Sequence, residues 1–233
     1  ATSANQSPLH TFNEARNYGV ILEITDIQGC SKSLADTTIR VTFPQPNFEI
    51  ENDTVCFNRK IGLRYTGSID KPYYNPQLLE DYTMTWDYDD GSARDTVTNS
   101  EIDSHTYAAG GFYTIKLIAK DRNGCKDSIT KSINVQQPSA YLYTENDRTK
   151  YCPALGITFN ADSSSKDVTE LFWAFGDGNA GRFDTIEQFT AFNNYQIAGN
   201  FDIQLIGQTS VGCLDTFIKE DYIQIAGPIA TIL

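Results

Sequence analysis

An internal repeat constrains the fold of this chain most strongly, because repeated modules must bury the same positions each time. A Gly-Cys dipeptide occurs three times, at Gly29-Cys30, Gly124-Cys125 and Gly212-Cys213. Apolar residues occupy alternate positions ahead of each dipeptide: Tyr18, Val20 and Leu22, then Tyr113, Ile115 and Leu117, then Phe201, Ile203 and Leu205. Such alternation is typical of a half-buried strand. The sequence therefore predicts three copies of one strand and hairpin.

A second set of landmarks has only two copies. A cysteine, Cys56 or Cys152, precedes an alternating strand, and a tryptophan, Trp86 or Trp173, follows it. The first Gly-Cys unit has neither. We therefore expect four segments: 1–43 is the back half of a truncated module, 44–136 and 137–226 are whole modules, and 227–233 starts a further one. On this interpretation the chain is a window from a longer tandem array.

Turn residues divide the segment 44–136 into short strands. We expect strands at about 47–51, 54–57, 61–67, 82–88, 94–98, 111–120 and 126–135. Seven short strands separated by turns every 8–12 residues are typical of an immunoglobulin-like sandwich. The predicted fold class is all-β, with Trp86 and Trp173 in the cores of tandem sandwich modules. Tyr107 and Tyr195 stand where a tyrosine corner is expected.

Charge and composition argue against several functions. The formal net charge of −12 opposes binding to nucleic acid and to anionic membranes. The chain has no apolar run of 18 residues, so we expect no membrane insertion. Its two histidines, His10 and His105, occupy the same repeat position, which favours a structural role over an active site. We therefore predict a protein that is not an enzyme.

Three aspartates beside a turn form the best candidate for a small-ligand site. Asp87, Asp89 and Asp90 could supply the hard oxygen ligands that calcium prefers, although no cofactor is expected on balance. The competing interpretation is that Asp90 and its counterpart Asp177 cap their turns, since aspartate side chains bind nearby backbone amides.

An insertion in the second module carries a candidate contact loop with Tyr73 and Tyr74. Exposed tyrosines can stack on sugars or anchor a protein partner. The alternative is that they pack against the preceding module.

Several ordered motifs resemble the PKD (polycystic kidney disease) domain family. Its Trp-x-Phe-Gly-Asp-Gly element is matched at 173–178, whereas the second module has Tyr88 and Asp89 in place of Phe and Gly. Its His-Thr-Tyr corner is intact at 105–107 and degenerate at 193–195. The combination with extra cysteines looks like tandem PKD arrays in very large Bacteroidota surface and secreted proteins, often exported by the type IX route.

The resemblance implies a function as well as a fold. It implies a non-catalytic, extracellular structural or adhesion repeat that spaces and stiffens a giant surface or filament-forming protein. Carbohydrate-binding accessory modules of a secreted hydrolase, or a self-assembling fibre subunit, are the alternatives. The expected partners are neighbouring modules, other copies of the chain in a fibre, or a cell-surface protein or glycan.

Five cysteines in such an array suggest disulfides. Pairing within modules would join Cys56 to Cys125 and Cys152 to Cys213. Pairing between neighbours would join Cys56 to Cys213 and leave the other three cysteines for modules outside this window. Both schemes stay open at this point.

Overall fold

The computed structural model describes residues 3–5, 7–69, 82–179, 184–185 and 189–227. The described residues form β-strands joined by turns, with one 3₁₀ turn (Glu145–Asp147) and no α-helix. The chain divides into two compact units, one of residues 1–51, 62–105 and 114–131 and one of residues 52–61, 106–113 and 132–233. None of the described residues lies in a helix that is long and apolar enough to cross a membrane.

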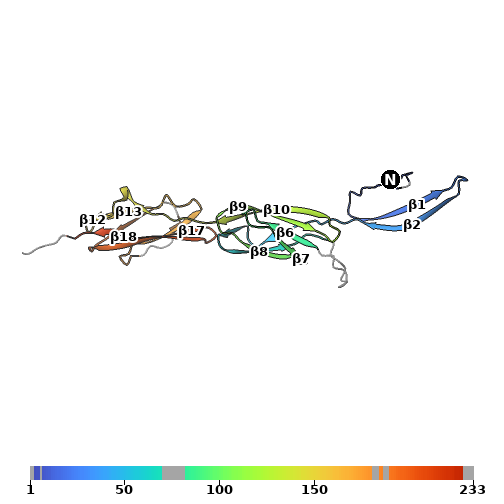
Figure 1. Ribbon diagram of the computed structural model, residues 1–233. Coiled ribbons are helices and arrows are strands. Elements are labelled where there is room, and N and C mark those ends of the chain that lie inside the picture. Colours follow the sequence, from blue (N-terminus) through green and yellow to red (C-terminus); the bar gives the residue numbers. More distant parts are fainter. Residues whose placement is uncertain (1–2, 6, 70–81, 180–183, 186–188, 228–233) are drawn as a thin grey trace, which may run out of the picture. The chain divides into compact units, whose positions relative to one another are not determined.

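The first two strands form a hairpin (Figure 1). Strands β1 (Asn17–Thr25) and β2 (Ser31–Arg40) pair antiparallel and form a two-stranded sheet. The intervening turn contains the first Gly-Cys dipeptide. The expected strand and hairpin are therefore present at the first repeat position.

The next strands form two sheets. The smaller has the order β3-β5-β8, from β3 (Phe48–Ile50), β5 (Lys60–Tyr65) and β8 (Ile102–Thr106). The larger has the order β4-β10-β9-β6-β7, from β4 (Thr54–Cys56), β10 (Lys126–Gln136), β9 (Gly111–Lys120), β6 (Thr83–Asp87) and β7 (Asp95–Thr98). Strand β4 runs parallel to the end of β10, with Cys56 opposite Gln136.

The apolar faces of these two sheets meet in a core. Trp86 on β6 is fully buried and lies edge-on to Phe48 on β3, with 5.2 Å between ring centroids. Leu63 from the smaller sheet and Leu117 from the larger are also buried. Burying each such side chain contributes about 1.5–3 kcal/mol. This arrangement is a β-sandwich with the tryptophan where the sequence predicts it.

A second sandwich repeats the pattern. Its smaller sheet has the order β11-β13-β16, from β11 (Tyr143–Thr144), β13 (Gly156–Asn160) and β16 (Thr190–Asn194). Its larger sheet has the order β12-β18-β17-β14-β15, from β12 (Lys150–Tyr151), β18 (Leu214–Ile225), β17 (Gly199–Thr209), β14 (Val168–Ala174) and β15 (Asp184–Thr185). Trp173 is 7% exposed in a core shared with Phe159 and Leu205. The prediction of all-β immunoglobulin-like sandwiches is confirmed.

The seven predicted strands of the first sandwich all form, and an eighth had not been predicted. Strand β8 joins the edge of the smaller sheet beside β5. Its sequence Ile-Asp-Ser-His-Thr is mostly polar and only half-buried, so it carries no alternating apolar signal. The four proposed domain segments stay predictions.

Both corner tyrosines are buried, and one of them binds the segment that carries the tryptophan motif. Tyr107 and Tyr195 are each 1% exposed. Tyr195 donates a hydrogen bond of 2.9 Å from Oη to the carbonyl of Phe175. Burial raises the pKa of Tyr195, which keeps its hydroxyl protonated as a donor.

We predict that Tyr195→Phe lowers the free energy of unfolding of the second sandwich by about 1–2 kcal/mol, because it leaves the buried Phe175 carbonyl without this donor. Urea denaturation followed by tryptophan fluorescence measures the change. Tyr143→Phe is the matched control, since its hydroxyl binds Asp162 at an exposed position, and we expect a loss below about 0.5 kcal/mol. Equal losses in the two variants would contradict the assignment.

Candidate functional site

The three Gly-Cys hairpins share one turn geometry. In the second, the amide of Asp121 donates to the carbonyl of Cys125, and the amide of Gly124 donates to the carbonyl of Asp121, both at 3.0 Å. The same two bonds form at 26–30 and at 209–213. The glycines have φ between 83° and 86°, a left-handed conformation that favours glycine. Each turn therefore presents its cysteine at the same position.

The third of these cysteines forms a disulfide. The bond joins Cys213 to Cys56, with 5.4 Å between the Cα atoms. It links the β17–β18 turn of the second sandwich to the end of β4 in the first. The other described cysteines, Cys30, Cys125 and Cys152, carry free thiols. The structure thus contains the bond between neighbouring modules and neither of the bonds within a module.

The register of β4 explains why pairing within a module fails. Cys56 lies opposite Gln136 at the last residue of β10, whereas Cys125 immediately precedes the first residue of that strand. The two positions are separated by 136 − 125 = 11 residues of extended chain. At about 3.3 Å per residue that is about 35 Å, whereas a disulfide needs Cα atoms within about 7 Å.

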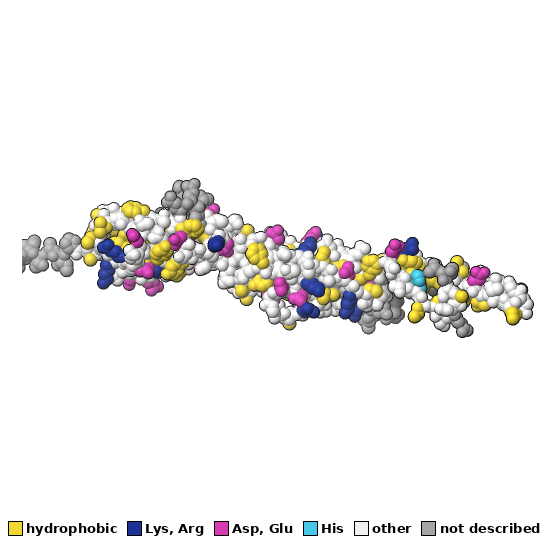
Figure 2. Space-filling model, turned by 90° about the horizontal axis from the view of Figure 1, so that it is seen from above, with side chains coloured by type: hydrophobic (Ala, Val, Ile, Leu, Met, Phe, Trp, Pro, Cys, Tyr) yellow, Lys and Arg dark blue, Asp and Glu magenta, His cyan; other side chains and the backbone are white. Residues whose placement is uncertain are grey.

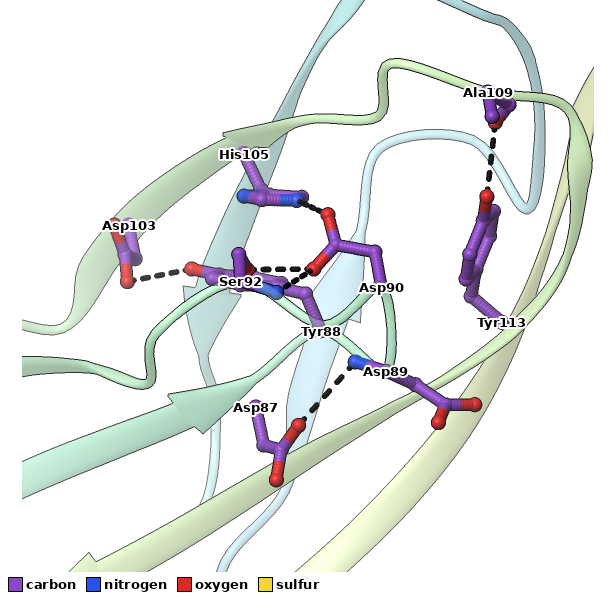
Figure 3. Close-up of polar contacts among 9 residues, drawn as sticks. All are labelled: Asp87, Tyr88, Asp89, Asp90, Ser92, Asp103, His105, Ala109 and Tyr113. Carbon is purple, nitrogen blue, oxygen red and sulfur yellow. Dashed lines mark hydrogen bonds and ion pairs between the residues drawn. The ribbon is translucent and has the colours of Figure 1, made fainter.

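The Asp-Gly turn of the first sandwich surrounds Asp90 with donors (Figure 3). Its Oδ1 accepts hydrogen bonds from the amide and the hydroxyl of Ser92, at 3.0 and 2.5 Å. Its Oδ2 accepts one from Nε2 of His105 at 2.7 Å. The ring of His105 stacks on Tyr88, whose hydroxyl donates to Asp103 at 2.8 Å. The corner histidine therefore holds the turn, as the repeat position indicates.

The environment of Asp90 favours its ionised form. Burial alone would raise the pKa of this carboxyl group, but the hydrogen bonds from Ser92 and then His105 outweigh it and leave the pKa below its usual range. The carboxylate is 16% exposed. The negative charge of Asp90 is therefore engaged by hydrogen bonds within the turn.

The neighbouring aspartates point elsewhere, as Figure 3 shows. Asp87 accepts from Nε of Arg94 at 2.8 Å and from the amide of Asp89 at 3.3 Å. Asp89 accepts from the amide of Thr114 at 3.1 Å. Within the described ranges, no three His, Cys, Asp or Glu side chains are arranged to hold a metal ion. The three carboxylates thus bind three different groups, and both the expectation of no cofactor and the weaker calcium alternative stay untested.

The second sandwich builds the same turn with different residues. Asp177 accepts from the amide of Asn179 at 3.0 Å and from the side-chain amide of Asn193 at 2.8 Å. Asn193 therefore replaces His105 as the corner donor. Capping of the turn by Asp90 and Asp177 is confirmed.

The residue before the capping aspartate differs between the two turns. It is a glycine in the second sandwich and an aspartate in the first. Gly176 has φ of 73°, and a Cβ there would lie 2.6 Å from the carbonyl oxygen of Asp202. Asp89 has φ of 63° at the equivalent position and uses its carboxylate to bind Thr114. This role of Asp89 was not predicted from the sequence, although the departure of Asp89 from the PKD motif marked the position.

Tyr73 and Tyr74 lie outside the described residues. The contact-loop hypothesis for these two tyrosines therefore stays a prediction.

We predict that Asp90→Asn destabilises the first sandwich at pH 7 and that this deficit shrinks as the pH falls below about 4. The folded pKa lies below the unfolded value of about 4, so the ionised carboxylate contributes stability above that value and loses it as the pH falls through the folded pKa. Urea denaturation of both proteins between pH 7 and pH 2 measures the difference. A deficit that does not change with pH would contradict the role of the charge.

We predict that Gly176→Ala costs more than about 2 kcal/mol, because it adds a steric conflict with Asp202 to the left-handed backbone. Gly178→Ala is the control, since its φ is also positive but nothing lies within 4 Å of its Cβ. It should cost about 1 kcal/mol. Thermal unfolding of the two variants compares them, and equal losses would exclude the steric effect.

Comparison with known proteins finds a match to the PKD domain family in part of this chain. Residues 74–137 match the family model of the PKD domain, whereas no curated protein matches the chain. Similar solved structures include the PKD1 domain of Vibrio anguillarum Epp, with 19% identity, coverage of 41% of this chain and 95% of that one, and a TM-score of 0.31. Others are the fibronectin(III)-like modules of Clostridium thermocellum CbhA (15% identity, 78% and 95% coverage, TM-score 0.34) and the ectodomain of mouse nectin-like molecule 4 (10% identity, 88% and 75% coverage, TM-score 0.39). The family match includes strands β6 to β10 of the first sandwich.

Proposed function

We propose that this chain is a non-catalytic, extracellular structural repeat that spaces and stiffens a large surface protein. The observation that carries the proposal is the disulfide between Cys56 and Cys213, which ties one sandwich to the next. Disulfides persist mainly in oxidising compartments such as the cell exterior. The PKD domain match at 74–137 agrees with a modular β-sandwich.

The position of the bond in the sequence gives it a mechanical consequence. The two cysteines are 157 residues apart, and both Trp86 and Trp173 lie between them. A pull on the two ends of the chain passes through the sulfur–sulfur bond and bypasses the residues it encloses. The segment between the two cysteines, which carries both tryptophans, is thus not extended by the load, whereas β3 and β18 lie outside it. Such a bond suits a module that must limit its extension under tension.

The surface charge supports a role as a spacer in solution. The formal net charge is −12, which favours solubility and opposes self-association. Figure 2 shows acidic and basic side chains interspersed over the visible face of the described residues. On this proposal the loops that differ between modules supply any adhesive contacts.

We predict that the disulfide hides about 55 nm of contour length when the chain is stretched between its ends. This length follows from the 157-residue separation at about 3.6 Å per extended residue. Single-molecule force spectroscopy with and without a thiol reductant measures it, and the reduced chain should show the additional unfolding events of both sandwiches.

Cys56→Ser provides the control, because it should release the full length without reductant. Cys152→Ser removes a free thiol and should leave the hidden length unchanged. Equal contour lengths before and after reduction of the unsubstituted chain would overturn the mechanical proposal.

A further inference from the structure

The β1–β2 hairpin has the same local structure as the central hairpins of the two sandwiches. In each case an aromatic residue of the corner contacts an aromatic residue near the start of the strand. Ring centroids are 4.4 Å apart for Phe12 and Tyr18, against 4.3 and 4.5 Å for the pairs 107–113 and 195–201. The hydroxyl of Tyr18 donates to the carbonyl of Glu14 at 3.0 Å, as residue 113 donates to residue 109. With the shared Gly-Cys turn, these contacts make β1–β2 the back half of a sandwich.

Its apolar face is nevertheless exposed. Val20 and Leu22 on β1 are 41% and 54% exposed, whereas the residues at the equivalent positions of β9 and β17 are fully buried at 0%. Ile39 on β2 is 36% exposed, whereas the equivalent residues of β10 and β18, at 133 and 223, are 1% and 0% exposed. The side chains that form the core elsewhere therefore have no covering sheet among the described residues.

The segment that follows β2 also lies beside the turn that presents Cys125. Thr42 donates from Oγ1 to Asp121 at 3.2 Å and accepts from Nδ2 of Asn123 at 3.0 Å. Asp121 and Asn123 belong to the turn that presents Cys125. The hydrogen bonds of Thr42 thus connect the hairpin that carries the apolar face to the turn that carries this thiol, within one compact unit.

The disulfide between the two sandwiches shows which kind of partner a cysteine of this turn binds. Cys213 binds Cys56, which lies on a strand parallel to β10 and opposite Gln136. Thr42 corresponds to Gln136, because each lies two residues before the proline that separates the modules, Pro44 or Pro138. A strand placed parallel to β2, with a cysteine opposite Thr42, would meet Cys125 in the same way.

We propose that the apolar face of β1–β2 binds the front half of a further PKD-like module and that a cysteine on its edge strand forms a disulfide with Cys125. The occupant is the segment that precedes residue 1 in the same polypeptide, because in both complete sandwiches the front half comes directly before the hairpin it covers. The bond forms when the two thiols lose two protons and two electrons to an external disulfide, such as oxidised glutathione, which is reduced to two thiols. This site is independent of the mechanical role proposed above.

A graft tests the proposal. Residues 137–195 are fused ahead of Asn13, so that the grafted Tyr195 replaces Phe12, and the product is refolded with reduced and oxidised glutathione. We expect non-reducing peptide mapping to find the grafted Cys152 bonded to Cys125. Hydrogen exchange of the β1–β2 amides should slow at least about 100-fold relative to the ungrafted chain, because these strands become part of a sandwich.

Two variants separate docking from cross-linking. Leu22→Asp should lower the melting temperature of the grafted protein and leave that of the ungrafted chain unchanged, since this side chain is exposed there. Cys-to-Ser substitution of the grafted Cys152 should prevent the bond and keep the slow exchange. A second graft, of residues 44–107, gives the same test if the first does not fold.

Two results would overturn the proposal. One is a folded graft in which Cys125 stays free and the β1–β2 amides exchange as fast as in the ungrafted chain. The other is an ungrafted chain that sediments as a dimer with protected β1–β2 amides, which would make a second copy the occupant.

Discussion

The burial of one strand pair beneath a second sheet is the interaction on which the rest of this structure depends. In each complete sandwich the central hairpin supplies alternating aliphatic residues, such as Ile115 and Leu117, and the front half covers them around a tryptophan. Each of these side chains contributes about 1.5–3 kcal/mol, whereas solvent screens an exposed ion pair such as Arg64 with Glu49. The β1–β2 hairpin shows the same element with no covering sheet among the described residues.

The Asp-Gly turn shows how one geometry tolerates different residues. Asp90 and Asp177 cap their turns alike, although one takes its corner donor from a histidine and the other from Asn193. What is preserved is a donor that reaches the Oδ2 atom of the capping carboxylate. The aspartates that suggested calcium are therefore engaged in folding the turn, and functional differences between modules are better sought where the sequences diverge.

The disulfide connects this local architecture to the proposed function. The bond depends on two features that belong to the fold of each individual sandwich. One is a parallel edge strand, which ends at Cys56, and the other is a tight turn, which presents Cys213. Because these features lie at opposite ends of a module, each can bond only to a neighbour. In the proposed array, the free thiols of Cys125 and Cys152 would occupy the corresponding positions at further junctions.

The sequence by itself determined the repeat, the sandwich class, the buried tryptophans and the capping aspartates, because strand alternation and turn chemistry are set by residues a few positions apart. It did not reveal β8, whose polar residues lie at a sheet edge and need no apolar alternation. It also left the cysteine pairing open, since that choice depends on distances between residues far apart in the chain. Only the tertiary structure placed Cys56 at the far end of β10 from Cys125 and within bonding distance of Cys213.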